Sequence, residues 1–148
     1  MQYESGNIWD IAEKNSGFVV VTTNTCIRAD GKAVMGGGIA LDAAIRYPVL
    51  PTVLGKHIKI LNEQLYMHFP IICFPTKTNW QLPSDIKLIE RGCVQLHMFG
   101  EVLDQLQVST KIYLPKLGCG LGGLNWEKTV RPVVDSILAT NRFVLVTQ

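Results

Sequence analysis

Two glycine-rich loops, far apart in the chain, constrain its fold more than any other feature. The first covers residues 34–40 (VMGGGIA) and the second residues 118–124 (GCGLGGL). Each follows a stretch with strand composition and leads into one with helical spacing. Glycine allows close approach of the backbone to a ligand, and a helix N-terminus presents free N–H groups with a positive dipole end. The pair therefore predicts a site for a ligand with two phosphates or a long nucleotide.

Strand-like and helix-like stretches alternate along the chain. Expected strands are residues 2–4, 18–23, 65–69, 71–75, 111–115 and 143–147. Expected helices are residues 8–14, 38–47, 51–64, 84–106 and 126–140, with Ser84 as the cap of the longest and an Asp42–Arg46 pair on the second. Residues 18–23 (FVVVTT) are almost continuously apolar, which is typical of a strand buried on both faces. The alternation predicts an α/β fold with a mixed, mostly parallel sheet.

Composition narrows the class of protein. With 148 residues, 47% of them hydrophobic, the chain fits a single globular domain spanning residues 1–148. The net charge of +2 comes without a Lys/Arg run, so we expect no stable nucleic-acid complex. We also expect a monomer, although no sequence feature determines the oligomeric state. The sequence contains neither a signal-peptide pattern nor an apolar run of the ~20 residues that a membrane helix needs, so we expect no membrane association.

The cysteines and histidines predict no metal site. Four cysteines are widely spaced without a Cys-x-x-Cys pair, which argues against zinc and against a disulfide framework. Reduced thiols favour a cytoplasmic protein. The three histidines also lack metal-ligand spacing, and we expect no metal or other cofactor.

Several side chains near the expected strand ends could carry chemistry. Asn24 could bind a ribose hydroxyl or could hold its loop as an Asn turn, and Asp30 lies in an Asp-Gly turn pair. Lys77, in the segment FPTKTNW, could clamp a phosphate, attack a sugar C1 or be a solvated loop lysine. Trp80 could stack on a ring or only cover the loop. Cys119 is interpreted as a small filler between two glycines, because no basic partner is close in sequence.

These motifs carry a family resemblance. Residues 6–9 (GNIW), Thr23-Asn24, the first glycine loop and residues 115–126 (PKLGCGLGGLNW) together resemble a macro domain over essentially the whole chain. The resemblance implies a three-layer α/β/α fold that binds ADP-ribose. Phe74-Pro75-Thr76-Lys77 and Trp80 are similar to the branch of terminal ADP-ribose glycohydrolases and of antitoxins that remove ADP-ribose from DNA. The longer loop at residues 28–32 resembles short bacterial and phage relatives.

The resemblance also implies site residues. Lys77 would be catalytic, Asn7 and Ile8 would lie at adenine, and Asn24 and Asp30 would face the distal ribose. Thr76 would border the ligand, with Met35 and Ile39 as candidate pocket walls or core residues. The diphosphate and distal ribose would be wrapped by the two loops, namely by Gly36, Gly37, Gly38, Ile39 and Ala40 and by Gly118, Cys119, Gly120, Leu121, Gly122, Gly123 and Leu124.

Two positions depart from the family pattern. Macro domains usually carry Asp where this chain has Asn7, and the lost charge assistance towards the adenine amino group is worth about 1 kcal/mol. The terminal glycohydrolases carry an Asp in the second loop, where this chain has Gly122-Gly123. Asp30 is then the nearest carboxylate that we can name as a catalytic partner of Lys77.

Four functions remain open at this point. The first is a lysine-dependent hydrolase that removes ADP-ribose from DNA or protein. The second is a non-catalytic ADP-ribose reader, and the third a phosphatase of ADP-ribose 1''-phosphate. The fourth, outside the family, is a general nucleotide-binding α/β domain. Full activity of a Lys77→Ala variant would exclude the catalytic role of that lysine.

Overall fold

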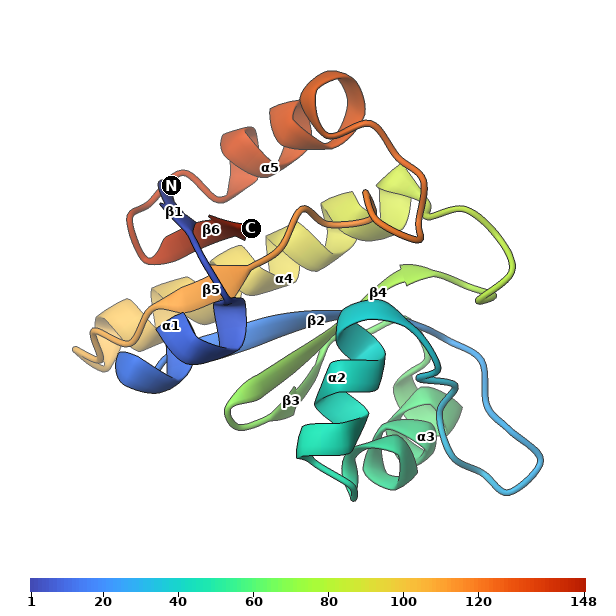
Figure 1. Cartoon of the computed structure of the whole chain (residues 1–148). Helices are drawn as coiled ribbons and strands as arrows, with labels where there is room; N and C mark the ends of the chain where they lie inside the picture. Colours follow the sequence, from blue (N-terminus) through green and yellow to red (C-terminus); the bar gives the residue numbers. More distant parts are fainter.

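A single six-stranded sheet organises the chain. The computed structural model describes residues 1–148 and orders the strands β1-β6-β5-β2-β4-β3 (Figure 1). The strands are β1 (Gln2–Ser5), β2 (Phe18–Asn24), β3 (Tyr66–His68), β4 (Ile71–Lys77), β5 (Ile112–Leu114) and β6 (Phe143–Thr147). All neighbours pair in parallel except β3, which is antiparallel to β4. The predicted mixed, mostly parallel sheet is confirmed.

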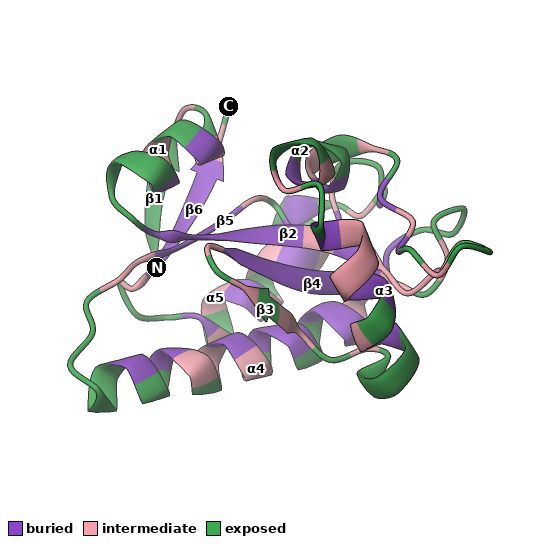
Figure 2. Ribbon diagram, turned by 90° about the horizontal axis from the view of Figure 1, so that it is seen from below, coloured by how far each residue is buried: buried purple, intermediate pink, exposed green.

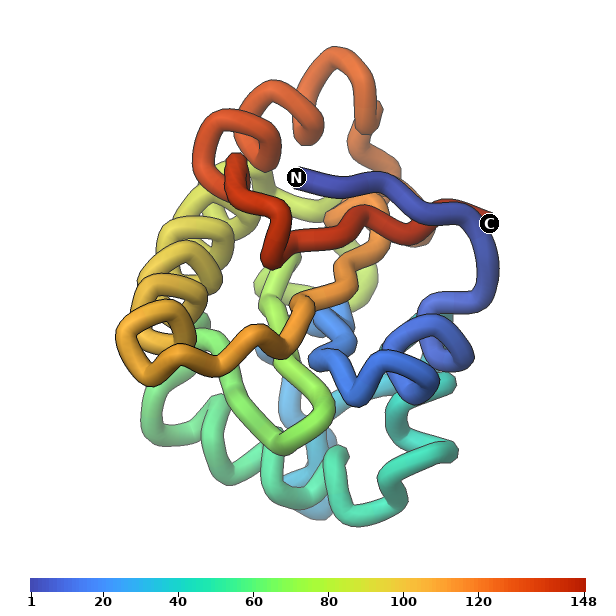
Figure 3. Tube along the Cα trace, turned by 90° about the vertical axis from the view of Figure 1, so that its left-hand side faces the viewer, coloured from blue at the N-terminus to red at the C-terminus, as the bar shows by residue number.

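Helices cover both faces of this sheet. They are α1 (Ile8–Lys14), α2 (Gly38–Arg46), α3 (Leu50–Leu61), α4 (Ile86–Gln105), a π-helical turn η1 (Trp126–Val130) and α5 (Arg131–Ile137). One core cluster lies under α4, η1 and α5, and the other under α1, α2 and α3. Figure 3 shows strands passing between the yellow α4 and the blue and teal helices. The fold is therefore the three-layer α/β/α arrangement that the resemblance to macro domains implied.

Strand β2 shows why the apolar run at its start forms a central strand. Phe18 and Val20 enter the core on one face of the sheet, while Val19 and Val21 enter the core on the other. Successive side chains of a strand point to opposite faces, so a strand buried on both sides must be apolar at every position. Figure 2 shows β2 and β4 as buried along most of their length.

Three local predictions were wrong. Helix α4 is capped by Asp85, whose carboxylate accepts the Lys87 N–H, and not by Ser84. The Asp42–Arg46 pair does not form, because the Arg46 guanidinium lies over the Trp9 ring, 4.7 Å from its centroid.

The expected helix 126–140 is also divided. A π-helical turn comes first, with the Arg131 N–H bonded to the Trp126 carbonyl, and an α-helix then runs from Arg131 to Ile137. Pro132 lacks an N–H and is tolerated only in the first turn of a helix, so the regular helix begins there. No helix of the fold combines the length and apolar character needed to cross a membrane.

Candidate functional site

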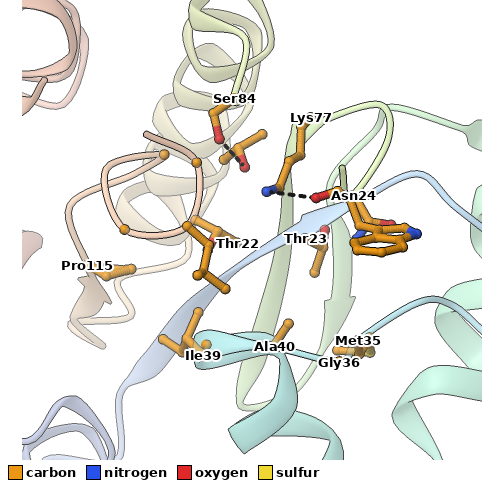
Figure 4. Close-up of a pocket in the computed structure, with 18 of the residues that line it drawn as sticks. Thr22, Thr23, Asn24, Met35, Gly36, Ile39, Ala40, Lys77, Ser84 and Pro115 are labelled. Atoms are coloured by element: carbon orange, nitrogen blue, oxygen red, sulfur yellow. Dashed lines mark hydrogen bonds between the residues drawn. The ribbon is translucent and has the colours of Figure 1, made fainter. Parts of the chain in front are cut away.

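A cleft of about 770 Å³ opens at the carboxyl ends of the central strands. It is lined by the ends of β2 and β4, by Pro115 and Lys116 after β5, and by both glycine loops (Figure 4). The ends of parallel strands are where α/β folds place ligands, and the volume lies in the range of small-molecule and cofactor sites. The tertiary structure thus brings the two distant loops to one site.

Each glycine loop supplies unpaired backbone donors to this cleft. Helix α2 has Gly37 as its N-cap without a side-chain cap, and the N–H groups of Gly38, Ile39 and Ala40 donate to no protein group. In the second loop the N–H groups of Gly120 and Leu121 are equally free. Groups of this kind at a helix N-terminus and in a glycine loop suit anionic oxygens such as those of phosphate.

The two loops approach each other across the cleft through Leu121. A Cβ on Gly37 would lie 2.9 Å from Leu121 Cδ1, although the Leu121 side chain is otherwise 76% exposed. By contrast, Gly36 and Gly120 have open space where a Cβ would stand. Leu121 therefore bridges the loops at the mouth of the cleft, and the open glycines leave room for a ligand.

Lys77 enters the cleft from the end of β4. The β2–β4 register shifts after Thr23, so that Thr23 pairs with Pro75 and Asn24 with Lys77. Such irregularities redirect side chains and are frequent beside active sites. The Lys77 Nζ reaches the Trp80 carbonyl oxygen at 3.4 Å and lies between the strand ends in Figure 4.

Asn24 both lines the cleft and holds the loop after β2. Its Nδ2 donates to the Val34 carbonyl at 3.1 Å, and its Oδ1 accepts the Cys26 N–H at 2.9 Å. The Asn-turn role is therefore present in the structure. One Nδ2 hydrogen remains free for a ligand, because a side-chain amide carries two donors.

The predicted adenine and carboxylate residues are not among those that line the cleft. Asn7 accepts the N–H groups of Trp9 and Asp10 through its Oδ1 and so caps α1, and Ile8 packs against the core below it. Asp30 lies at an exposed loop tip, where its carboxylate pairs with Arg28 at 3.0 Å. The structure does not bring Asp30 to Lys77, because Asp30 is bound within its own turn.

Three predicted residues of the second loop, Cys119, Gly123 and Leu124, are not among those that line the cleft. Leu124 packs against the core, and Gly123 turns the chain at a φ of +75°. The Cys119 Sγ donates to the Leu117 carbonyl at 3.3 Å, and burial raises the pKa of this thiol. These contacts favour the interpretation of Cys119 as a filler, because a raised pKa disfavours the thiolate.

Sequence reasoning missed part of the lining, namely Thr22, Thr23, Val34, Ser84, Pro115 and Lys116, and left Trp80 undecided. The threonines could have been found, since they end a buried parallel strand. Ser84 carried no signal for the cleft, because a serine directly before a helical pattern indicates a helix cap.

The charge of the cleft is positive. Lys77 and Lys116 are its only ionisable lining residues, and neither Asp nor Glu lines it. No group of three or more His, Cys, Asp or Glu side chains is placed to hold a metal ion. The lining therefore suits an anionic ligand.

The amino-acid sequence is similar to those of curated proteins from other organisms. No protein-family profile matches the chain. It is 33% identical over 128 residues to a DNA ADP-ribosyl glycohydrolase of Mycobacterium tuberculosis, covering 79% of this chain and 34% of that protein. A DNA ADP-ribosyl glycohydrolase of Thermus aquaticus is 30% identical over 117 residues, covering 72% and 31%. The chain thus spans about one third of the length of these curated relatives.

Solved structures match over the whole fold. The macrodomain of Mycobacterium tuberculosis DarG superposes with a TM-score of 0.75 and 28% identity, covering 99% of this chain and 97% of that chain. The Thermus aquaticus DarG macrodomain gives 0.73 and 27%, with the same coverage. Thermosipho africanus DarTG, solved in complex with ADP-ribose, gives 0.67 and 25%, covering 88% and 37%. The chain is therefore a macrodomain, and it resembles those of the DarG proteins.

Proposed function

We propose that this macrodomain binds ADP-ribose in the cleft and hydrolyses the bond that joins it to DNA. The observation that carries the proposal is the Lys77 side chain, which enters the cleft between the two glycine loops. The relatives named DNA ADP-ribosyl glycohydrolase support the reaction and the substrate.

The backbone supports binding of the diphosphate. The free N–H groups at the start of α2 and in the second loop can donate hydrogen bonds to two phosphates side by side, and Lys116 adds positive charge. Unmodified DNA should bind weakly, because the net charge is only +2. Recognition then depends on the ADP-ribose itself, and we infer that a monomer suffices. The free cysteines suit the reducing cytoplasm, where bacterial DNA lies.

The reaction breaks the bond between C1 of the distal ribose and the acceptor atom of the DNA base. Water supplies a hydroxyl to C1 and a proton to the acceptor, so the products are free ADP-ribose and unmodified DNA. Lys77 can act in two ways. Its amine can attack C1, so that a C–N bond forms as the bond to the base breaks and the base takes up a proton, and water then hydrolyses the C–N bond. Alternatively, its ammonium can donate a proton to the departing acceptor while water attacks C1.

A non-catalytic reader is the second candidate. It is favoured by one observation: the cleft contains no carboxylate that could activate water or assist Lys77. A reader needs the backbone donors and the cleft, but no chemistry at the lysine. The two functions therefore differ in turnover and agree in ADP-ribose binding.

Release of ADP-ribose from an ADP-ribosylated oligonucleotide tests the proposal. We expect release by the wild type and by the control Lys14→Ala, at the exposed end of α1, and none by Lys77→Ala, which should still bind ADP-ribose. If the amine attacks C1, the adduct can open to an imine between C1 and the Lys77 Nζ, and cyanoborohydride present during turnover would reduce that imine and trap the sugar on the lysine. Binding without release by the wild type would favour the reader. Release only from ADP-ribosylated protein would show that the substrate is protein and not DNA. Release only of phosphate from ADP-ribose 1''-phosphate would show that the domain is a phosphatase of that compound.

A further inference from the structure

Ser84 is one of three buried polar side chains in the fold, with Thr23 and Thr76. Its hydroxyl donates to the Thr76 hydroxyl at 3.2 Å, and both side chains line the cleft (Figure 4). Ser84 is 7% exposed and Thr76 2% exposed, so water hardly reaches the pair. Neither residue caps a helix, since Asp85 caps α4.

Backbone hydrogen bonds on either side of Ser84 join two parts of the cleft. The Ser84 N–H donates to the Gly122 carbonyl at 2.9 Å, and the Asp85 N–H donates to the Thr76 carbonyl at 2.7 Å. The first bond holds the second glycine loop, and the second holds the residue before Lys77. Together with the hydroxyl pair, these bonds fasten the loop to the end of β4.

The Ser84 side chain also fills the inside of the second loop. A Cβ on Gly122 would lie 2.1 Å from the Ser84 Oγ, and a Cβ on Gly118 would lie 3.0 Å from the Ser84 Cβ. A loop folded around Ser84 in this way has no room for any side chain at position 122. This accounts for glycine at position 122, in the part of the loop where the terminal glycohydrolases carry an Asp.

We propose that Ser84 is a positioning residue that sets the second glycine loop relative to Lys77. The inference rests on the proposed function for its effect on turnover. Its hydroxyl bond to Thr76 holds the loop donors and the lysine amine at a defined separation, as a reaction between a bound diphosphate sugar and a fixed amine requires. Removing one hydroxyl leaves the other buried without a partner, and the loop shifts to relieve it.

A double-mutant cycle tests the coupling. We expect Ser84→Ala and Thr76→Val each to lower kcat for ADP-ribose release about tenfold, with KM changed less than about threefold. The double variant should be no slower than either single one, because it leaves no hydroxyl unpaired. Ser136→Ala, which removes an exposed serine hydroxyl bonded to the Val133 carbonyl on α5, is the matched control and should keep the wild-type kcat. An unchanged kcat in Ser84→Ala, or losses that multiply to about a hundredfold, would overturn the proposal.

A second readout separates this inference from the proposed function. Amide hydrogen exchange at Cys119, Gly123 and Leu124, whose N–H groups bond to backbone carbonyls of residues 116–120, should become at least about tenfold faster in Ser84→Ala and stay unchanged in Ser136→Ala, whether or not the protein turns over substrate. If the wild type releases no ADP-ribose, the proposed function fails, and hydrogen exchange by itself still measures how Ser84 holds the loop. Unchanged exchange in Ser84→Ala would refute the positioning role by itself.

Discussion

Replacing Gly122 by alanine should damage the cleft through a clash that the structure makes specific. The new Cβ would lie 2.1 Å from the Ser84 Oγ and 2.5 Å from the Gly118 carbonyl oxygen, where ordinary contact begins at 3.4 Å. The serine side chain could rotate away, but the carbonyl belongs to the backbone and can move only with the loop. Overpacking of this kind costs about 1–3 kcal/mol, which lowers Tm by about 2–4 °C for each kcal/mol in a chain of this size. We also expect the Kd for ADP-ribose to rise about tenfold, because the loop donors move.

Gly120→Ala is the matched control in the same loop, since a Cβ at that position meets nothing within 4 Å. Thermal unfolding followed by circular dichroism, and calorimetry with ADP-ribose, measure both variants. Gly120→Ala should unfold within about 2 °C of the wild type, because a substitution away from any tight contact changes stability by no more than about 0.5 kcal/mol. Ser84→Ala should not rescue Gly122→Ala, since the Gly118 carbonyl remains in place. Equal unfolding temperatures for Gly122→Ala and Gly120→Ala would refute the steric argument.

Three further predictions follow from the placement of charged and buried groups. Asp30→Ala should keep kcat for ADP-ribose release within about twofold of the wild type, because its carboxylate pairs with Arg28 outside the cleft. A loss of activity of more than about tenfold would indicate that Asp30 takes part in catalysis. Asp85→Ala should lower the free energy of unfolding by about 1 kcal/mol in urea titrations, because α4 loses its N-cap; an unchanged midpoint would contradict this. Burial raises the pKa of Cys73 and of Cys93 to about 12, so the unfolded chain releases thiol protons first and the free energy of unfolding should fall as pH rises above about 9. The Cys73→Ala/Cys93→Ala double variant should show a flatter pH dependence between pH 9 and 11, and an identical slope would show that other groups dominate.

Much of the fold could be predicted because it depends on local pattern. The continuous apolar run of β2 required burial on both faces, and each glycine loop required a strand before it and a helix after it. These requirements led to the α/β fold and to a cleft at the strand ends, and both are confirmed. The capping of α4 was mispredicted because Ser84 and Asp85 are adjacent residues of capping type. Only the position of Thr76 opposite Ser84 decides that the serine turns inward.

For the candidate site, too, some features follow from local sequence and others only from the tertiary structure. The sequence by itself determined which segments are strands, which are helices and where the backbone could approach a phosphate, because propensity, periodicity and glycine act over a few residues. The tertiary structure alone decided which side chains meet in the cleft, because this depends on the neighbouring positions of β5, β2 and β4 and on the register shift that sets Lys77 opposite Asn24. It placed Ser84 inside the second loop and left Asp30 bound to Arg28, since contacts between distant segments form only when the chain has folded.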